Sequence, residues 1–154
     1  MGNDAAVEAE RGPDSGLRIV EDFDELVGLV ERRPGMYLRY SAGLQADLES
    51  GHSRDYEADV DLPGWSVTTI SPEPWWPRPV ADWVARRICQ YAHLAEEPDR
   101  FAWLLDGRLV GRGPDHEPLV VDMDPVIRIG DPALDTALEI YRERFNVGDD
   151  SRRD

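Results

Sequence analysis

Four short apolar segments follow one another in the second half of the chain, with no helical pattern between them. They read FAWLL, RLVG, EPLVV and PVIRI, and together they occupy residues 101–129. Apolar and β-branched runs of this length, separated by turn residues, are typical of strands. Parallel neighbours would need a crossover of a dozen or more residues between them. We therefore expect antiparallel or mixed pairing, and the pattern excludes the alternating βαβ folds.

The turn residues between these runs refine the expectation. Asp106-Gly107 lies between FAWLL and RLVG and suits a two-residue type I′ turn, so we predict a hairpin there. EPLVV and PVIRI are predicted to be two further strands, joined by residues 122–125. Earlier in the chain, GWSVTTI at 64–70 is rich in strand-forming residues, and MYLRYS at 36–41 alternates apolar with polar positions.

Three segments carry the 3.6-residue apolar spacing of amphipathic helices. The first places Phe23, Leu26, Val27 and Val30 on one face, the second runs from Val80 to Leu94, and the third follows Asp131-Pro132. LQADLES at 44–50 is predicted to add one helical turn at most. About three helices with a mixed or antiparallel sheet predict the α+β class.

Length and composition point to a single domain. The chain has 154 residues, which suffice for one core. Residues 17–147 are assigned to this domain. Residues 1–16 and 148–154 are small, polar and without apolar periodicity, and they are predicted to be disordered tails.

The charge of the chain limits its partners. The formal net charge is −15, and all 17 basic residues are arginine. A strongly negative surface repels phosphate polymers and anionic lipid, so we expect no nucleic acid and no membrane as partner. A small nucleotide held by arginine, or a basic protein, remains compatible. One cysteine, no signal-peptide pattern and no long apolar stretch predict a cytoplasmic protein without disulfides.

Five polar residues are candidates for a site. Arg39 is predicted to project from a strand, where its planar guanidinium suits a phosphate or carboxylate. Ser66 and Thr68 are expected on one face of another strand, as a pair of hydroxyls for a ribose or amide. Asp115 and Glu117, two positions apart before an apolar run, are expected to point to the same side. A carboxylate there can bond a sugar hydroxyl and stabilise an oxocarbenium-like transition state.

Each candidate also has a purely structural interpretation. Arg39 can pair with a surface acid, the hydroxyls can face solvent, and Glu117 can keep a strand edge soluble. A metal-dependent hydrolase is a further alternative, in which carboxylates hold Mg²⁺ or Mn²⁺; our primary interpretation involves no metal. The residues of that alternative are Asp115, Glu117, Asp122 and Asp124, with His116 between the first two.

Tryptophan is concentrated around a proline-rich connector. SPEPWWPRP at 71–79 has four prolines in nine residues and contains Trp75 and Trp76, with Trp65 and Trp83 nearby. Prolines at this density predict a stiff extended segment and not a helix. The rings are expected either to anchor this segment onto the core or to wall a pocket.

Two resemblances follow from these motifs. GMYLRYSAG, DLPGWSVTT, EPWWPRPV and GRGPDHEPLV resemble an uncharacterised family of short proteins from GC-rich bacteria, a domain of unknown function, across most of residues 25–145. That family implies no activity.

The order of a strand arginine, a hydroxyl strand, and an acid two residues before a glutamate also looks like the Arg–Ser–Glu type of ADP-ribosyltransferase. That likeness implies that Arg39 holds the phosphates or ribose of NAD and that Ser66 with Thr68 shapes the nicotinamide pocket. It further implies that Glu117 steadies the oxocarbenium, with Asp115 as the preceding acid.

The resemblance to ADP-ribosyltransferases departs from their pattern at two places. The hydroxyl strand reads Ser66-Val67-Thr68 instead of Ser-Thr-Ser, and Asp115 is shorter than the usual Glu or Gln. The second departure argues against protein arginine as the acceptor. This resemblance implies an ADP-ribosyltransferase-like domain that binds or cleaves NAD, by dissociative loss of nicotinamide. The alternative is a non-enzymatic acidic interaction or accessory protein.

Overall fold

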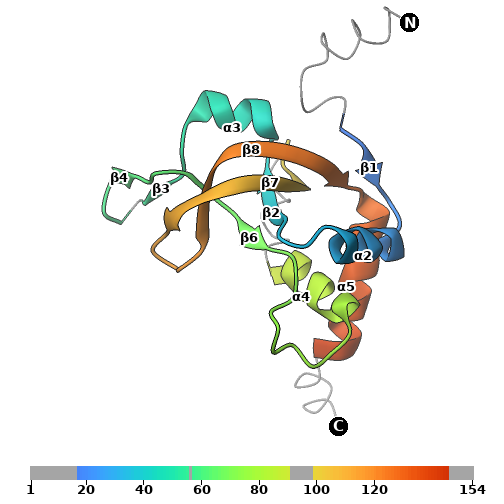
Figure 1. Ribbon diagram of the computed structural model, residues 1–154. Helices are drawn as coiled ribbons and strands as arrows, with labels where there is room; N and C mark the ends of the chain where they lie inside the picture. The colour runs from blue at the N-terminus through green and yellow to red at the C-terminus, as the bar shows by residue number, and fades with distance from the viewer. Residues whose placement is uncertain (1–16, 56, 91–98, 146–154) are drawn as a thin grey trace, which may run out of the picture.

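A curled mixed sheet covered on one side by helices forms the body of the protein (Figure 1). The computed structural model describes residues 17–55, 57–90 and 99–145. Within them the strands are β1 (Ile19–Val20), β2 (Tyr37–Ser41), β3 (Arg54–Asp55), β4 (Val60–Asp61), β5 (Trp65–Ser66), β6 (Thr68–Thr69), β7 (Phe101–Arg112) and β8 (Pro118–Ile129). The helices are α2 (Phe23–Arg32), α3 (Leu44–Ser50), α4 (Val80–Gln90) and α5 (Asp131–Phe145).

The α+β class and the mixed sheet are confirmed, and the sheet closes upon itself. β1 pairs parallel with β8, whereas β8, β7, β2 and β6 pair antiparallel in that order. β5 pairs with β8 on the side away from β7. Because β5 and β6 are separated only by Val67, the segment from Trp65 to Thr69 joins β8 to β2 and completes a ring. GWSVTTI is therefore two short strands and not one, since the chain changes neighbours at the buried Val67.

The predicted hairpin at Asp106-Gly107 is wrong. β7 runs unbroken through both residues and β8 runs unbroken from Pro118 to Ile129, so the hairpin turns at residues 113–117 instead. Gly107 serves a packing purpose, because a Cβ there would lie 3.0 Å from the Cβ of Val120. The pairing register shifts on either side of it, which bends the long ribbon over the sheet.

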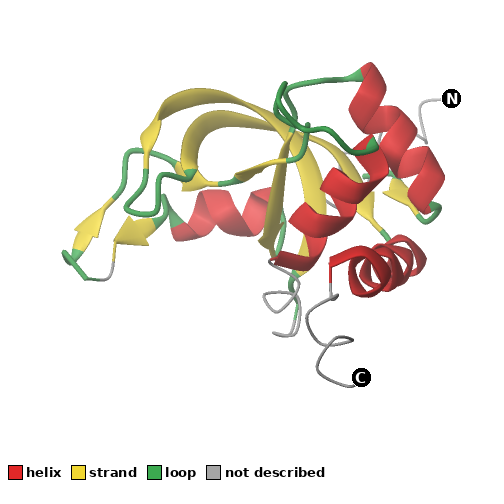
Figure 2. Cartoon of the chain, turned by 90° about the horizontal axis from the view of Figure 1, so that it is seen from below, coloured by secondary structure: helices red, strands yellow, loops and turns green. Residues whose placement is uncertain are grey.

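Four helices are present among the described residues, one more than the sequence predicted. The additional one is α3, a short helix at one end of the sheet, whereas α2, α4 and α5 lie on the opposite side (Figure 2). α2 buries Phe23, Leu26 and Val30, as its spacing predicts, and an Asp22 carboxylate caps its first turn. None of these helices has the length and apolar character of a membrane span.

Two apolar cores lie on the two faces of β2. Met36, Leu38 and Tyr40 pack towards the helices, together with residues of α2, α4 and α5. The opposite face contacts a smaller core that includes Leu44, Val67, Trp103, Leu105 and Val120. This alternation confirms the predicted strand at 36–41. The predicted tails and the end of the helix expected at 91–94 lie outside the described residues.

Gly64 permits the closure of the ring. A Cβ at this position would lie 2.6 Å from the backbone oxygen of Val120 and 3.1 Å from a Val110 methyl carbon, so a side chain would push β5 away from β8. We predict that Gly64→Ala lowers the free energy of unfolding by about 1–3 kcal/mol in urea denaturation. The matched control is Gly28→Ala in α2, where the nearest contact is the flexible Arg32 side chain at 3.2 Å. Gly28→Ala is expected to stabilise the protein by about 0.5–1 kcal/mol. Equal effects of the two changes would show that Gly64 is not required for the closure of the ring.

Cys89, on α4, is half-buried and faces Tyr40. Burial raises the pKa of the Cys89 thiol from 9.0 to about 11, although the Arg142 charge acts in the opposite direction. Burial also raises the pKa of Tyr40, whose hydroxyl donates to the Ile88 carbonyl at 2.8 Å. The protonated thiol thus favours the folded state below about pH 9, and this contribution is lost as the pH rises through 11.

We predict slow alkylation of Cys89 in the folded protein. At pH 8 the thiolate fraction is smaller by roughly 100-fold than for an ordinary thiol, and only the thiolate reacts. Iodoacetamide labelling followed by mass spectrometry measures this rate, with the guanidinium-unfolded chain as the control. Equal rates in the folded and unfolded chains would show that the site does not shield the thiol.

Candidate functional site

One broad, open cleft of about 1220 Å³ lies beside α3 and the β7–β8 turn. Its walls come from residues 38–42, 46–47 and 50–54, from residues 66–69, from residues 112 and 115–118, and from Glu73, Arg87, Gln90, Asp99 and Arg100. The structure brings all five residues singled out in the sequence to this cleft: Arg39, Ser66, Thr68, Asp115 and Glu117. They are far apart along the chain, and it is the closure of the ring that places them together.

Arg39 is held by an ion pair inside the cleft wall. Its Nε donates to Asp47 Oδ2 at 2.8 Å and its Nη2 to Asp47 Oδ1 at 3.2 Å, while Nη1 donates to the Ser66 carbonyl at 2.6 Å. The side chains of Arg39 and Asp47 are only 15% and 9% exposed. Arg39 projects from the face of β2 that the alternation predicts, yet its partner is a buried acid of α3 and not a surface acid.

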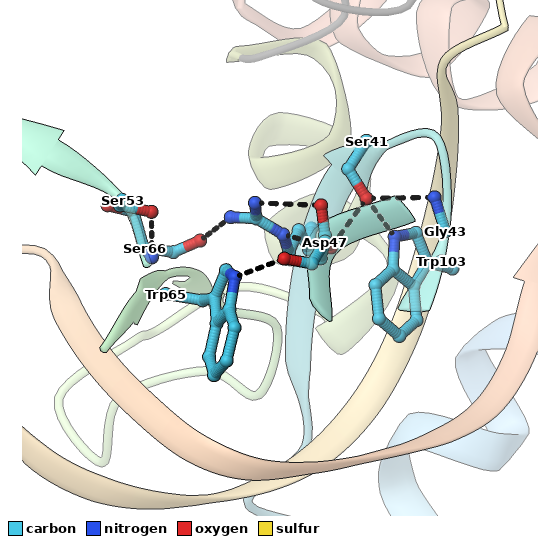
Figure 3. Close-up of polar contacts among 8 residues, drawn as sticks. Ser41, Gly43, Asp47, Ser53, Trp65, Ser66 and Trp103 are labelled. Atoms are coloured by element: carbon cyan, nitrogen blue, oxygen red, sulfur yellow. Dashed lines mark hydrogen bonds and ion pairs between the residues drawn. The ribbon is translucent and has the colours of Figure 1, made fainter. Parts of the chain in front are cut away.

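The network around Asp47 extends to two buried indoles (Figure 3). Ser41 Oγ donates to Asp47 Oδ2 at 2.9 Å and accepts a hydrogen bond from Trp103 Nε1 at the same distance. Trp65 Nε1 donates to the backbone oxygen of Asp47 at 3.2 Å. The contacts of Ser41 and Trp65 fix α3 against β2 and β5, and the contact of Trp103 ties β7 to β2 beside them. Asp47, Ser41 and Trp103 were not predicted as site residues, because only tertiary contacts bring them together. The local signal that could have pointed to Ser41 and Asp47 is their polar character within short, partly apolar segments.

Ser66 and Thr68 present hydroxyls on the cleft. The Ser66 backbone is bonded on both sides, with its N–H donating to Ser53 Oγ at 2.8 Å and its carbonyl accepting from Arg39. Neither hydroxyl forms a hydrogen bond within the part of the chain that the structure describes. The two residues belong to different strands, so they do not form the expected pair on one regular strand, but both line the cleft.

Glu117 stands at the start of β8, as predicted, but its carboxylate folds back over the turn. Glu117 Oε1 accepts the Asp115 N–H at 3.0 Å, and a Cβ on Gly113 would lie within 2.5 Å of the carboxylate. His116 has φ +63°, so residues 115–117 form a turn and not the extended backbone that the sequence suggested. Asp115 and Glu117 therefore do not point to one side in the manner of a strand.

Arg112 adds a cation to the rim of the cleft. It is exposed, and it contacts only the His116 backbone oxygen, at 3.4 Å, among the described residues. No ion pair of Arg112 forms within that part of the chain. Arg39, by contrast, is neutralised by Asp47. Arg112 is thus better placed than Arg39 to attract an anion from solvent.

The carboxylates of the metal alternative do not converge. Among residues 17–55, 57–90 and 99–145, no group of three or more His, Cys, Asp or Glu side chains could hold a metal ion. Asp122 instead accepts from Arg108 Nε at 2.9 Å on an exposed part of the β7–β8 ribbon. The arrangement that a carboxylate-metal hydrolase requires is absent from this part of the chain.

We predict that Asp47→Asn destabilises the protein strongly. The change keeps the shape of the side chain but leaves the Arg39 charge largely buried without its counter-charge, which is expected to cost about 2–4 kcal/mol of unfolding free energy. Asp61→Asn is the matched control, because Asp61 pairs with Arg54 while 75% exposed and should contribute below about 1 kcal/mol. Urea denaturation followed by tryptophan fluorescence measures both. A loss at Asp47 no larger than that at Asp61 would show that the buried pair is not structural.

The comparisons with known proteins identify a family of unknown function, as the first resemblance did, and none of them assigns an activity. No curated protein and no solved structure matches the chain. A family of unknown function, DUF6098, matches residues 13–152, which includes the whole cleft and both cores. The chain belongs to this family of unknown function.

Proposed function

We propose that the cleft binds a small nucleotide, with NAD as the first candidate. The observation that carries this proposal is the meeting of Ser66, Thr68, Asp115 and Glu117 around one cleft large enough for a ligand of this size. The hydroxyls of Ser66 and Thr68, which have no hydrogen-bond partner among the described residues, suit the polar edges of a ribose or an amide. The exposed guanidinium of Arg112 suits a phosphate.

Glu117 is the proposed catalytic residue if the bound NAD is cleaved. In dissociative cleavage, the bond between the ribose and nicotinamide breaks, and its electron pair leaves with nicotinamide. The ribose carbon then carries positive charge until water or another acceptor adds to it. Glu117 Oε1 already accepts the Asp115 N–H, which leaves Oε2 to face this charge or to accept a ribose hydroxyl.

Arg39 has a different place in this proposal from the one that the resemblance to ADP-ribosyltransferases implies. To anchor the pyrophosphate, its guanidinium would have to exchange the two Asp47 oxygens for phosphate oxygens. Its contact with the Ser66 carbonyl supports a positioning role, in which Arg39 fixes the segment that carries the two hydroxyls. The proposal therefore gives the phosphate contact to Arg112 and the positioning of β5 to Arg39.

Substitution of Glu117 separates chemistry from folding. We predict that Glu117→Gln lowers the rate of nicotinamide release by on the order of 10²–10³. The melting temperature should stay almost unchanged, because the glutamine oxygen can still accept the Asp115 N–H. Chromatographic detection of nicotinamide with differential scanning fluorimetry measures both. Glu73→Gln is the control, since Glu73 also lines the cleft and is exposed.

Binding is tested separately from turnover. A thermal shift series with NAD, ADP-ribose, AMP and nicotinamide should show stabilisation by the phosphate-bearing ligands, and Arg112→Gln should weaken it. If none of the four ligands raises the melting temperature of the wild-type protein at millimolar concentration, the nucleotide proposal is wrong.

A second candidate is a non-enzymatic accessory protein that binds a basic partner. It is favoured by the fact that Arg39 and Glu117 both satisfy contacts within the molecule, as structural residues do. The chain has 32 acidic residues against 17 arginines, so its exposed carboxylates suit a cationic surface. This candidate would be favoured over the first if the nucleotides left the melting temperature unchanged while an arginine-rich peptide bound saturably.

A further inference from the structure

An aromatic surface with arginines around it lies where the proline-rich connector meets α4 and α5. Trp75 is 68% exposed, and its ring contacts the edges of Trp76 and Trp83 at centroid distances of 6.1 and 5.9 Å. Trp76 in turn stacks on Phe145 of α5 at 6.5 Å. Figure 1 shows the connector passing beside the end of α5. We call this surface the Trp75 patch, and its residues are Trp75, Trp76, Arg78, Arg86, Arg144 and Phe145.

The Trp75 patch has a fixed framework. Asp82 is 2% exposed at its base and pairs with Arg78 Nε at 3.2 Å and with Arg144 Nη1 at 3.1 Å. Prolines on both sides of the two tryptophans limit the conformations of the connector. Trp83, beneath Trp75, is 3% exposed, and its indole N–H has no hydrogen-bond partner among the described residues. The exposed ring is thus presented on a rigid base.

The charge of the Trp75 patch is opposite to that of the chain. Three arginines, Arg78, Arg86 and Arg144, belong to the patch, and Asp82 is the one acid among the described residues with which they form an ion pair. Arg78 and Arg86 lie over the Phe145 ring at 4.4 and 5.9 Å, and Arg78 also pairs with Asp82. Arg86 forms no ion pair with any residue in the described part of the chain. A positive surface of this kind is unusual in a chain of net charge −15.

We infer that the Trp75 patch is a docking site for an acidic, extended segment of a partner protein. Carboxylates of the segment pair with Arg78, Arg86 and Arg144, and a proline or aliphatic side chain covers Trp75. Aromatic surfaces favour proline-containing extended peptides, because little conformational entropy is lost when they bind. A short acidic segment needs only the local positive charge. A long nucleic acid or an anionic membrane would also meet the negative remainder of the surface.

The experiment uses fluorescence anisotropy with the full chain and three labelled peptides. The peptides are EPEPEPEP, the basic KPKPKPKP and the uncharged SPSPSPSP. We expect the acidic peptide to bind at least ten-fold more tightly than either of the others. Arg86→Glu and Trp75→Ala should each weaken its binding ten-fold or more, because they remove a charge and the apolar contact respectively. Arg108→Glu is the matched control on the β7–β8 ribbon, where the side chain is 66% exposed, and it should change the affinity less than two-fold.

Three results would overturn this inference. The first is that the acidic peptide does not bind at millimolar concentration, or binds no better than the uncharged one. The second is an equal loss in Arg108→Glu, which would place the peptide elsewhere. The third is that labelled single-stranded DNA, or a second copy of the chain detected by light scattering, occupies the patch in preference to the peptide. Circular dichroism of each variant establishes that a loss of binding is not a loss of folding.

Discussion

The ion pair between Arg39 and Asp47 joins three parts of the chain. It fixes α3 to β2, and through the Ser66 carbonyl it also fixes the segment that closes the sheet. Both charges are largely buried, so either one alone would remain desolvated without compensation. The hydrogen bonds from Ser41 and Trp65 to Asp47 complete the polar contacts of this acid. The cleft has its shape because this network holds its wall in place.

This network also decides which parts of the cleft can act on a ligand. An anion that approached Arg39 would have to compete with the carboxylate of Asp47, and the two negative charges would then lie close together in a poorly solvated place. Arg112, Ser66 and Thr68 carry no such competitor within the described residues. The cleft therefore has a structural wall and a rim with available polar groups. Ligand chemistry is expected at the rim, where Glu117 also lies.

The local sequence pattern was sufficient to predict a residue's structural role where that role depends on its near neighbours in the chain. The alternation at 36–41 predicted which side chains of β2 face the helices, and the spacing in α2 predicted its buried face. Roles that depend on contacts between residues far apart in the chain could not be predicted from the local sequence pattern. Asp106-Gly107 has the composition of a turn, but Gly107 is there for its close approach to Val120, which lies 13 positions further on. Asp47 likewise looks like any polar residue of a short helix until Arg39 is placed beside it.

The distribution of arginine suggests how so acidic a chain can still accept anionic groups. Charges more than about 8 Å away are largely screened at physiological ionic strength, whereas groups within about 4 Å interact almost in full. A small anion at one arginine therefore feels little of the net charge of −15, whereas a large polyanion that extends across the surface comes close to many carboxylates and is repelled. At short range, Arg112 at the cleft rim and Arg86 in the Trp75 patch are each without a carboxylate partner among the described residues. Small anions and short acidic segments would meet these groups locally, which is how we propose that the chain discriminates against phosphate polymers and still binds a nucleotide or a carboxylate-rich peptide.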